Sequence, residues 1–88
     1  MKINNLTTLK MVLRNGPYAW PGGYPLYLID EEGDCYHLEC VRRIFRSVVA
    51  DTKYRKGGYI MTNVEVNWEN TTLWCYECHE IIDSAYGE

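Results

Sequence analysis

The sequence predicts a small α+β domain. Two segments, 6–15 and 40–51, place apolar residues at helical spacing. Two others, 26–29 and 59–68, are rich in the β-branched and aromatic residues that favour strands. With 88 residues the chain is predicted to be a single domain over 1–88, and cores of this size are often reinforced by a metal ion or by disulfides.

The helix predicted over residues 6–15 has recognisable ends. Asn5 suits the N-cap position, and Gly16 suits the position after the last turn. The following segment, 17–25, holds three prolines and two glycines, so we expect a shaped loop there. The second helix is the central one and begins at Cys40.

The strand segments predict two short β-hairpins. Residues 26–29 form a strand, a glycine-containing turn follows, and residues 35–36 return beside it. Residues 59–68 form a strand that alternates near its end, and residues 71–74 return after a turn. Residues 80–85 are predicted to form one or two turns of helix.

The chain has four cysteines, and their setting favours metal binding. Its first residues lack the apolar run of a signal peptide, and no stretch is long enough to cross a membrane. We therefore expect a reducing cytoplasm, where cysteines serve as metal ligands more often than as disulfides. Cys75 and Cys78 form a C-x₂-C knuckle, whose spacing lets both sulfurs reach one ion.

The first knuckle, which supplies the other two ligands, has two interpretations. His37 and Cys40 share the x₂ spacing, while Cys35 and Cys40 are four residues apart, which zinc pairs also allow. Residues 36–40 repeat the layout of residues 74–78: an aromatic, a ligand, two spacers and a ligand. The sequence favours a structural zinc ion whose ligands are His37, Cys40, Cys75 and Cys78. Cys35 remains the alternative fourth ligand.

Several segments together resemble a known group. They are the loop Tyr18–Pro25 with the strand after it, the glycine turn before the first knuckle, Val66–Glu69, the knuckle Cys75–Cys78 and the ending Asp83–Glu88. The chain resembles small zinc-knuckle, zinc-ribbon-like proteins of tailed bacteriophages and prophages. The resemblance implies a phage protein that acts on its bacterial host in the cytoplasm, and it implies no particular activity. In that group the first knuckle resembles a plain C-x₂-C, whose first cysteine falls on His37 here.

The charge of the chain is unevenly distributed. The net charge is −3, but a central segment is basic and could contact a phosphate backbone. The alternative is that this segment is the solvated face of an amphipathic helix. The candidate basic residues are Arg42, Arg43, Arg46, Lys53, Arg55 and Lys56.

Two further surfaces are candidates for binding. The aromatic residues Tyr18, Trp20 and Tyr24 of the loop could stack on bases or enter a partner's pocket, or they could cover the metal knuckles as part of the core. The acidic segments on either side of the basic one could present a negative surface to a partner. Their candidate residues are Glu31, Glu32, Asp34, Glu77, Glu80 and Asp83.

The sequence predicts a binding protein and not an enzyme. It contains no metalloprotease, dinucleotide-binding, phosphate-loop or serine-hydrolase motif, and four protein ligands would make the zinc structural. The favoured function is modulation or inhibition of a host protein, for example a defence nuclease complex or a polymerase. The alternative is a nucleic-acid-binding protein that uses the central basic segment. No membrane partner is expected, and the sequence makes no prediction of the oligomeric state.

Overall fold

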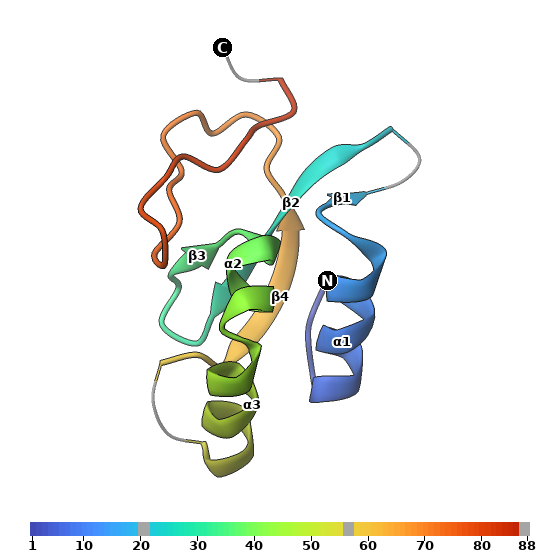
Figure 1. The fold of residues 1–88 in the computed structure, drawn as a ribbon. Coiled ribbons are helices and arrows are strands. Elements are labelled where there is room, and N and C mark those ends of the chain that lie inside the picture. Colours follow the sequence, from blue (N-terminus) through green and yellow to red (C-terminus); the bar gives the residue numbers. More distant parts are fainter. Residues whose placement is uncertain (20–21, 56–57, 87–88) are drawn as a thin grey trace.

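The structure is a computed structural model that describes residues 1–19, 22–55 and 58–86 (Figure 1). It confirms the α+β class, with helices and an antiparallel sheet. The elements of the described residues are, in chain order, α1 (Leu6–Asn15), β1 (Tyr18–Ala19), β2 (Tyr24–Asp30), β3 (Cys35–Tyr36), α2 (Leu38–Arg43), α3 (Phe45–Tyr54) and β4 (Met61–Val66).

Strand β2 is the centre of the sheet. Leu28 pairs with Tyr36 of β3 on one edge and with Val64 of β4 on the other, and both pairings are antiparallel. The short strand β1 pairs with the beginning of β2. The hairpin of β2 and β3 is the first predicted hairpin. Because it ends immediately before residue 37, it places the first metal knuckle at the edge of the sheet.

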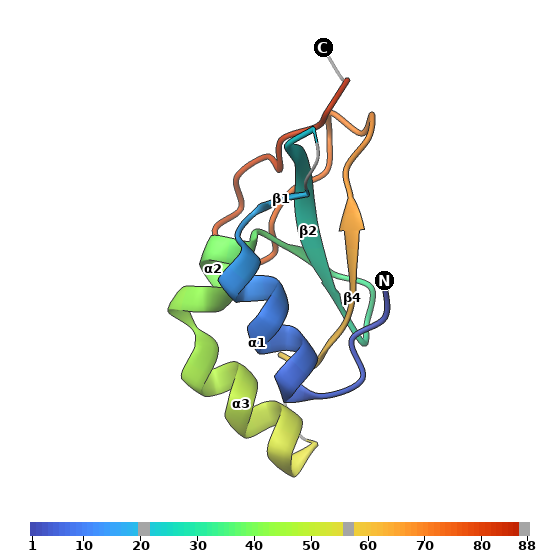
Figure 2. The same ribbon diagram turned by 90° about the vertical axis from the view of Figure 1, so that its right-hand side faces the viewer.

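The three helices lie on one face of this sheet (Figure 2). Leu28 of β2, Val41 of α2 and Val48 of α3 are all fully buried. They belong to one hydrophobic core. Burial of apolar side chains is the main favourable term in folding. The hydrophobic core is therefore concentrated between the helices and the strands.

Helix α1 begins and ends as the sequence predicts. The side chain of Asn5 accepts a hydrogen bond from the backbone N–H of Thr8 at 2.9 Å, which satisfies one free donor of the first turn. Gly16 follows the helix with a φ of 92°, a conformation that glycine adopts without strain. The buried side of α1 carries Leu9, Val12 and Leu13.

The central helix differs from its prediction in two ways. It begins at Leu38, two residues earlier than expected, and it is interrupted at Ile44, which separates α2 from α3. Ile44 leaves the helical conformation with φ −102° and ψ 22°. Since Val41 and Val48 are both fully buried, the two helices still contribute apolar side chains to the same core.

The region around the second knuckle also differs from its prediction. Residues 71–74 do not return along β4, whose partner is β2, and residues 80–85 are not helical. Trp74 instead pairs with Ile81 in an isolated bridge, and the Ile82 N–H donates to the Leu73 carbonyl at 2.8 Å. A helix would need these backbone N–H groups for its own hydrogen bonds, but here they donate across the knuckle. The second knuckle therefore closes a small hairpin. No helix among the described residues is long and apolar enough to cross a membrane.

Candidate metal centre

Four side chains from the two knuckles converge at one point. His37 is the N-cap residue of α2, and Cys40 lies in the first turn of that helix. Cys75 and Cys78 flank the turn that follows Trp74. The ligand atoms of these four residues all lie within 4.8 Å of one another, so the cluster can hold a metal ion.

The individual distances suit a tetrahedral ion. His37 Nδ1 lies 3.3 Å from Cys78 Sγ and 3.8 Å from Cys40 Sγ. Ligands bound to a tetrahedral zinc ion at its usual bond lengths are roughly 3.5–3.8 Å from one another. The two distances from His37 Nδ1 therefore lie close to those of such a site.

The second ring nitrogen of His37 has its own partner. Nε2 lies 3.2 Å from the carbonyl oxygen of Ile81. A carbonyl accepts, so Nε2 carries the proton and Nδ1 presents its lone pair to the sulfurs. Metal-ligating histidines are commonly oriented by such a bond. Through it, the first knuckle is linked to the hairpin of the second.

Backbone donors surround the sulfur of Cys75. Burial of this thiol opposes its ionisation, but N–H groups of Cys78, His37 and Glu77 point at the sulfur and lower its pKa to about 7. The His37 N–H, for example, lies 3.4 Å from it. Hydrogen bonds to the charged form of a group favour that form. This arrangement stabilises a thiolate, which is the form that ligates metals.

The sulfur of Cys40 has a different environment. Burial, followed by hydrogen bonding with the thiols of Cys78 and Cys75, raises the pKa of Cys40 to about 12. A bound dication reverses this effect because it lowers the pKa of the thiols that ligate it. The guanidinium of Arg43 lies 3.5 Å from this sulfur and adds a positive charge beside it.

Cys35, the alternative ligand, lies outside the cluster. It is on β3, and successive side chains of a strand point to opposite faces, so it faces away from the buried Tyr36. Its sulfur is 3.9 Å from the Gly33 carbonyl. Burial, with the nearby charge of Asp34, raises the pKa of Cys35. Cys35 contacts the second knuckle through its backbone, since its carbonyl accepts from the Tyr76 N–H at 2.8 Å.

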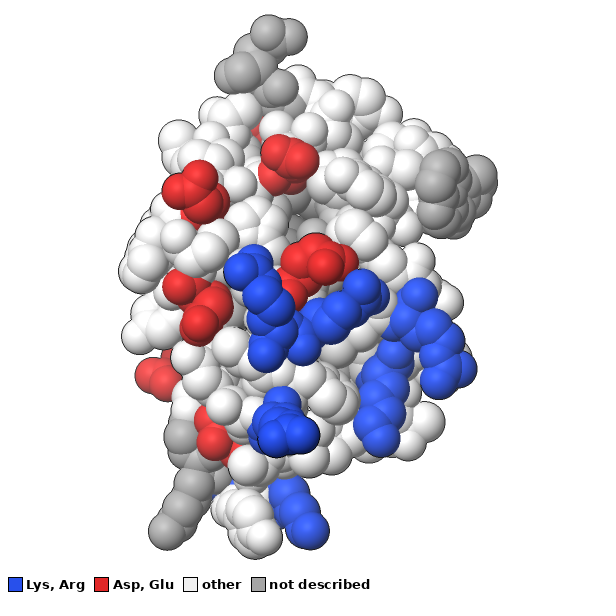
Figure 3. Space-filling view, in the orientation of Figure 1, with Lys and Arg blue, Asp and Glu red and all other residues white. Residues whose placement is uncertain are grey.

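The predicted basic residues do not form one group. Arg42, Arg43, Arg46 and Lys53 are exposed on α2 and α3, whereas Arg55 follows α3 and pairs with Glu31 at 3.1 Å. Lys56 lies outside the described residues. Most Lys and Arg side chains gather over the three helices in Figure 3. Sequence reasoning missed two of the cations over the helices, Lys10 and Arg14 of α1, because tertiary packing brings them beside the cations of α2 and α3.

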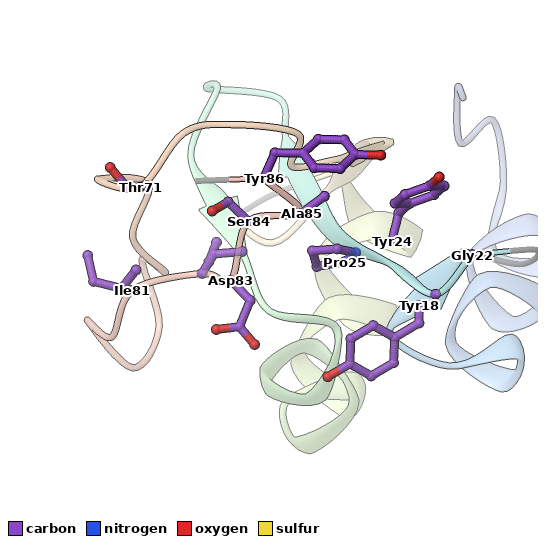
Figure 4. Close-up of a pocket in the computed structure, with 12 residues that line it drawn as sticks. Tyr18, Gly22, Tyr24, Pro25, Thr71, Ile81, Asp83, Ser84, Ala85 and Tyr86 are labelled. Atoms are coloured by element: carbon purple, nitrogen blue, oxygen red, sulfur yellow. The ribbon is translucent and has the colours of Figure 1, made fainter. Parts of the chain in front are cut away.

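The loop aromatics lie beside the C-terminal segment. Tyr24 packs on Trp68, with ring centroids 4.7 Å apart, and on Tyr86 at 6.2 Å. Tyr18 is exposed and faces this segment with Tyr24 across a groove of about 690 Å³ (Figure 4). Trp20 lies outside the described residues. The described aromatics of the loop therefore line a groove, and Tyr18 also lines a smaller pocket together with the ligand His37.

A second group of aromatics surrounds the Cys75–Cys78 turn. The ring of Trp74 stacks on that of His79, with centroids 5.7 Å apart, and on that of Tyr76 at 6.5 Å. Ile81 lies across the bridge from Trp74 and is exposed. We call this group, Trp74, Tyr76, His79 and Ile81, the knuckle surface. Sequence reasoning did not single out this surface. Its aromatics flank the cysteines in the sequence, and that proximity could have pointed to it.

The acidic candidates lie in two places. Glu31, Glu32 and Asp34 are in the turn between β2 and β3, where the Asp30 carboxylate accepts the N–H groups of residues 32 and 34. Glu80 and Asp83 are exposed beside the knuckle surface. Glu77 is half-buried and accepts from the Tyr59 hydroxyl at 2.9 Å. This hydrogen bond and burial raise the pKa of Tyr59.

Comparison with known proteins gives no relative for this arrangement. No protein-family model matches the chain, and neither does any curated protein or solved structure. What the chain does therefore has to be inferred from the ligand cluster and from the surfaces around it.

Proposed function

We propose that the four ligands hold one structural zinc ion, and that the protein is a non-catalytic binding protein. The observation that carries this proposal is the cluster itself, with all four ligand atoms within 4.8 Å of one another. Three sulfurs and one imidazole in tetrahedral positions are typical of zinc. The carbonyl of Ile81 adds the outer hydrogen bond that zinc-binding histidines usually have.

The composition of the site supports a structural role. A catalytic zinc has three protein ligands and keeps its fourth position for water or substrate. Here four side chains could supply all four ligands, and two of them are buried. The ion would act as a cross-link between the edge of the sheet and the C-terminal segment, and function would reside on the surfaces that this cross-link orders.

The knuckle surface is the proposed binding site. Trp74 is 49% exposed, Tyr76 47% and Ile81 56%, although all three are large and apolar. Exposed apolar groups that form one patch commonly mark interaction sites, and Trp and Tyr dominate the energetics of protein interfaces. Stacking and the adjacent metal site would hold these rings in place before binding, which reduces the entropy lost on association.

The partner we propose is a protein with an apolar pocket surrounded by Lys and Arg. Glu80 and Asp83 are exposed beside the knuckle surface and would complement such a rim. The resemblance to phage zinc-knuckle proteins supports a bacterial host protein as this partner, with modulation or inhibition as the outcome. A defence nuclease complex or a polymerase would suit, since proteins that handle nucleic acid carry basic surfaces.

A pull-down from bacterial lysate tests this proposal with a matched pair of variants. Trp74 and Trp68 are both 49% exposed, but Trp68 lies outside the knuckle surface. Zinc-loaded wild type and Trp68→Ser should capture the same protein at one-to-one stoichiometry, and Trp74→Ser should lose it at least tenfold. Capture should weaken as salt rises. Equal capture by both variants, or turnover of a substrate that depends on the metal, would contradict the proposal.

A further inference from the structure

The helix layer presents a second surface with the opposite charge. Helices α1, α2 and α3 hold six of the nine Lys and Arg residues and only two of the twelve acidic residues. Their net charge is +4, while the remainder of the chain carries −7, for a total of −3. We call the exposed cations of this layer the helix face: Lys10, Arg14, Arg42, Arg43, Arg46 and Lys53.

A shallow hollow lies at the centre of the helix face. It has a volume of about 410 Å³ and lies between α1 and the other two helices. Lys10, Arg14 and Arg42 supply three cations to its lining, and Leu13 and Phe45 supply apolar atoms. The guanidinium of Arg42 donates to the Leu13 carbonyl, which ties α2 to α1. The hollow thus gathers positive charge from two helices at a fixed separation.

Most of these cations lack an acidic partner within the described part of the chain. The described residues form three ion pairs, and only Arg42–Glu39, at 3.3 Å, lies on the helix face. Lys10 and Arg14 are one helical turn apart. Like charges at this spacing destabilise a helix by about 0.2–0.5 kcal/mol. An anionic ligand bound between the two cations would offset this repulsion.

The helix face differs from the knuckle surface in its apolar groups. Among the exposed large apolar residues of the described chain, only Met11 and Tyr54 belong to the three helices. Protein interfaces depend on buried Trp, Tyr and other aromatic anchors, and single-stranded nucleic acids bind by stacking bases on exposed rings. A duplex needs neither, because its phosphates are bound by Lys and Arg.

We infer that the helix face binds the phosphate backbone of a nucleic acid duplex, with the Lys10–Arg14–Arg42 hollow as the central phosphate contact. This site goes beyond the proposed function and depends on neither the identity of the metal nor the partner of the knuckle surface. The acidic remainder of the molecule would repel the duplex and so confine it to the helices. Affinity should be that of a sequence-independent site, with a Kd of roughly 10⁻⁴–10⁻⁶ M at physiological salt.

The test is binding of a labelled 20-base-pair DNA duplex, measured by fluorescence anisotropy over a series of salt concentrations. The double variant K10Q/R14Q removes two charges from the helix face, and K2Q/R55Q removes two from outside it. We expect K10Q/R14Q to weaken binding about tenfold or more, and to flatten the slope of log K against log salt by about 0.9 for each lost phosphate contact. K2Q/R55Q should retain at least half of the wild-type affinity and nearly the whole slope.

Several outcomes would overturn the inference. They are no duplex binding by the wild type at 50 mM salt, equal losses in the two double variants, or tighter binding of the matching single strand. Displacement of the duplex by poly-glutamate at equal charge concentration would also overturn it, because the site would then accept any polyanion. Loss of fold cannot imitate the expected result if K10Q/R14Q melts at or above the wild-type temperature.

Discussion

The helix layer and the knuckle end, residues 67–86, are stabilised in different ways. Most of the buried apolar residues lie in the helices and the sheet. Between residues 67 and 86 only Asn67, Cys75 and Ile82 are buried. The knuckle end also lacks regular strands and helices, so little of it is stabilised by a hydrophobic core. We infer that the metal ion and a few hydrogen bonds take the place of that core.

The two regions also differ in what they expose. The helix layer presents cations with few exposed aromatics, and the knuckle end presents stacked aromatics beside carboxylates. The partners that we propose for these surfaces therefore differ, a polyanion for the first and a basic protein for the second. In this account one small domain has two binding faces, and the zinc site lies beside only one of them.

Removal of the metal should have the largest effect. Structural zinc contributes roughly 10–16 kcal/mol of binding free energy at neutral pH, which is comparable to the whole stability of a small domain. A strong chelator should therefore abolish the cooperative melting transition or lower its temperature sharply. Hydrogen exchange at submaximal chelator should show residues 73–82 losing protection before β2 and β4.

The variants Cys75→Ser and Cys35→Ser provide the control for this prediction. The first removes a ligand and should reproduce the effect of the chelator. The second leaves the four ligands intact, so its melting temperature should stay within a few degrees of the wild type and remain sensitive to the chelator. Uniform loss of protection across the chain would contradict the division into two regions.

A cavity in the main core should have the next largest effect. Leu28 is fully buried between the helices and the sheet, and Leu28→Ala is expected to cost about 2–5 kcal/mol in the free energy of unfolding. Denaturant unfolding of the zinc-loaded protein measures this cost. The folded variant should still bind one metal ion. A loss below about 1 kcal/mol would mean that the metal, and not the core, stabilises the sheet.

The hydrogen bonds of Asn67 should matter less, but within the knuckle end. Its buried amide donates to the carbonyls of Asn70 and Asp83 at 3.0 Å and of Ile82 at 3.2 Å. Asn67→Ala leaves carbonyls without this donor, at a cost of about 1–3 kcal/mol. The loss should appear in hydrogen exchange near residue 82. Asn4→Ala, at an exposed position, should change stability by less than about 0.5 kcal/mol.

The smallest effect concerns the helix face and has the opposite sign. Lys10→Gln removes a like-charge pair with Arg14 and should stabilise the protein by about 0.2–0.5 kcal/mol at low salt. The gain should fall as salt rises, because screening weakens interactions between exposed charges. Thermal melting at two salt concentrations measures it. A destabilised variant would show that Lys10 contributes to the fold.

Local signals made part of this structure predictable. Helix α1 follows from its cap residues and apolar spacing, and the knuckle ligands follow from the repeated layout of residues 36–40 and 74–78. The choice of His37 over Cys35 follows from the same layout, in which Cys35 belongs to the returning strand that precedes the knuckle. Signals of this kind depend on residues that are close in the sequence.

Other features depend on contacts between distant segments. The carbonyl of Glu80 accepts a hydrogen bond from the Cys75 N–H. Residues 80–85 therefore pair across the knuckle and do not form the predicted helix. The interruption at Ile44 falls within the apolar spacing of residues 40–51, where no glycine or proline marks it. Lys10 and Arg14 join the basic face because α1 packs beside α2. Spacing within one segment carries no information about such neighbours.

The metal content of freshly purified protein tests the central claim most directly. Native mass spectrometry of the wild type, His37→Ala and Cys35→Ala gives the mass of bound metal per chain. The account predicts one zinc ion in the wild type and in Cys35→Ala, and loss or strongly weakened retention in His37→Ala. A wild-type chain without metal would contradict the account, and so would a zinc ion that survives His37→Ala but is lost from Cys35→Ala.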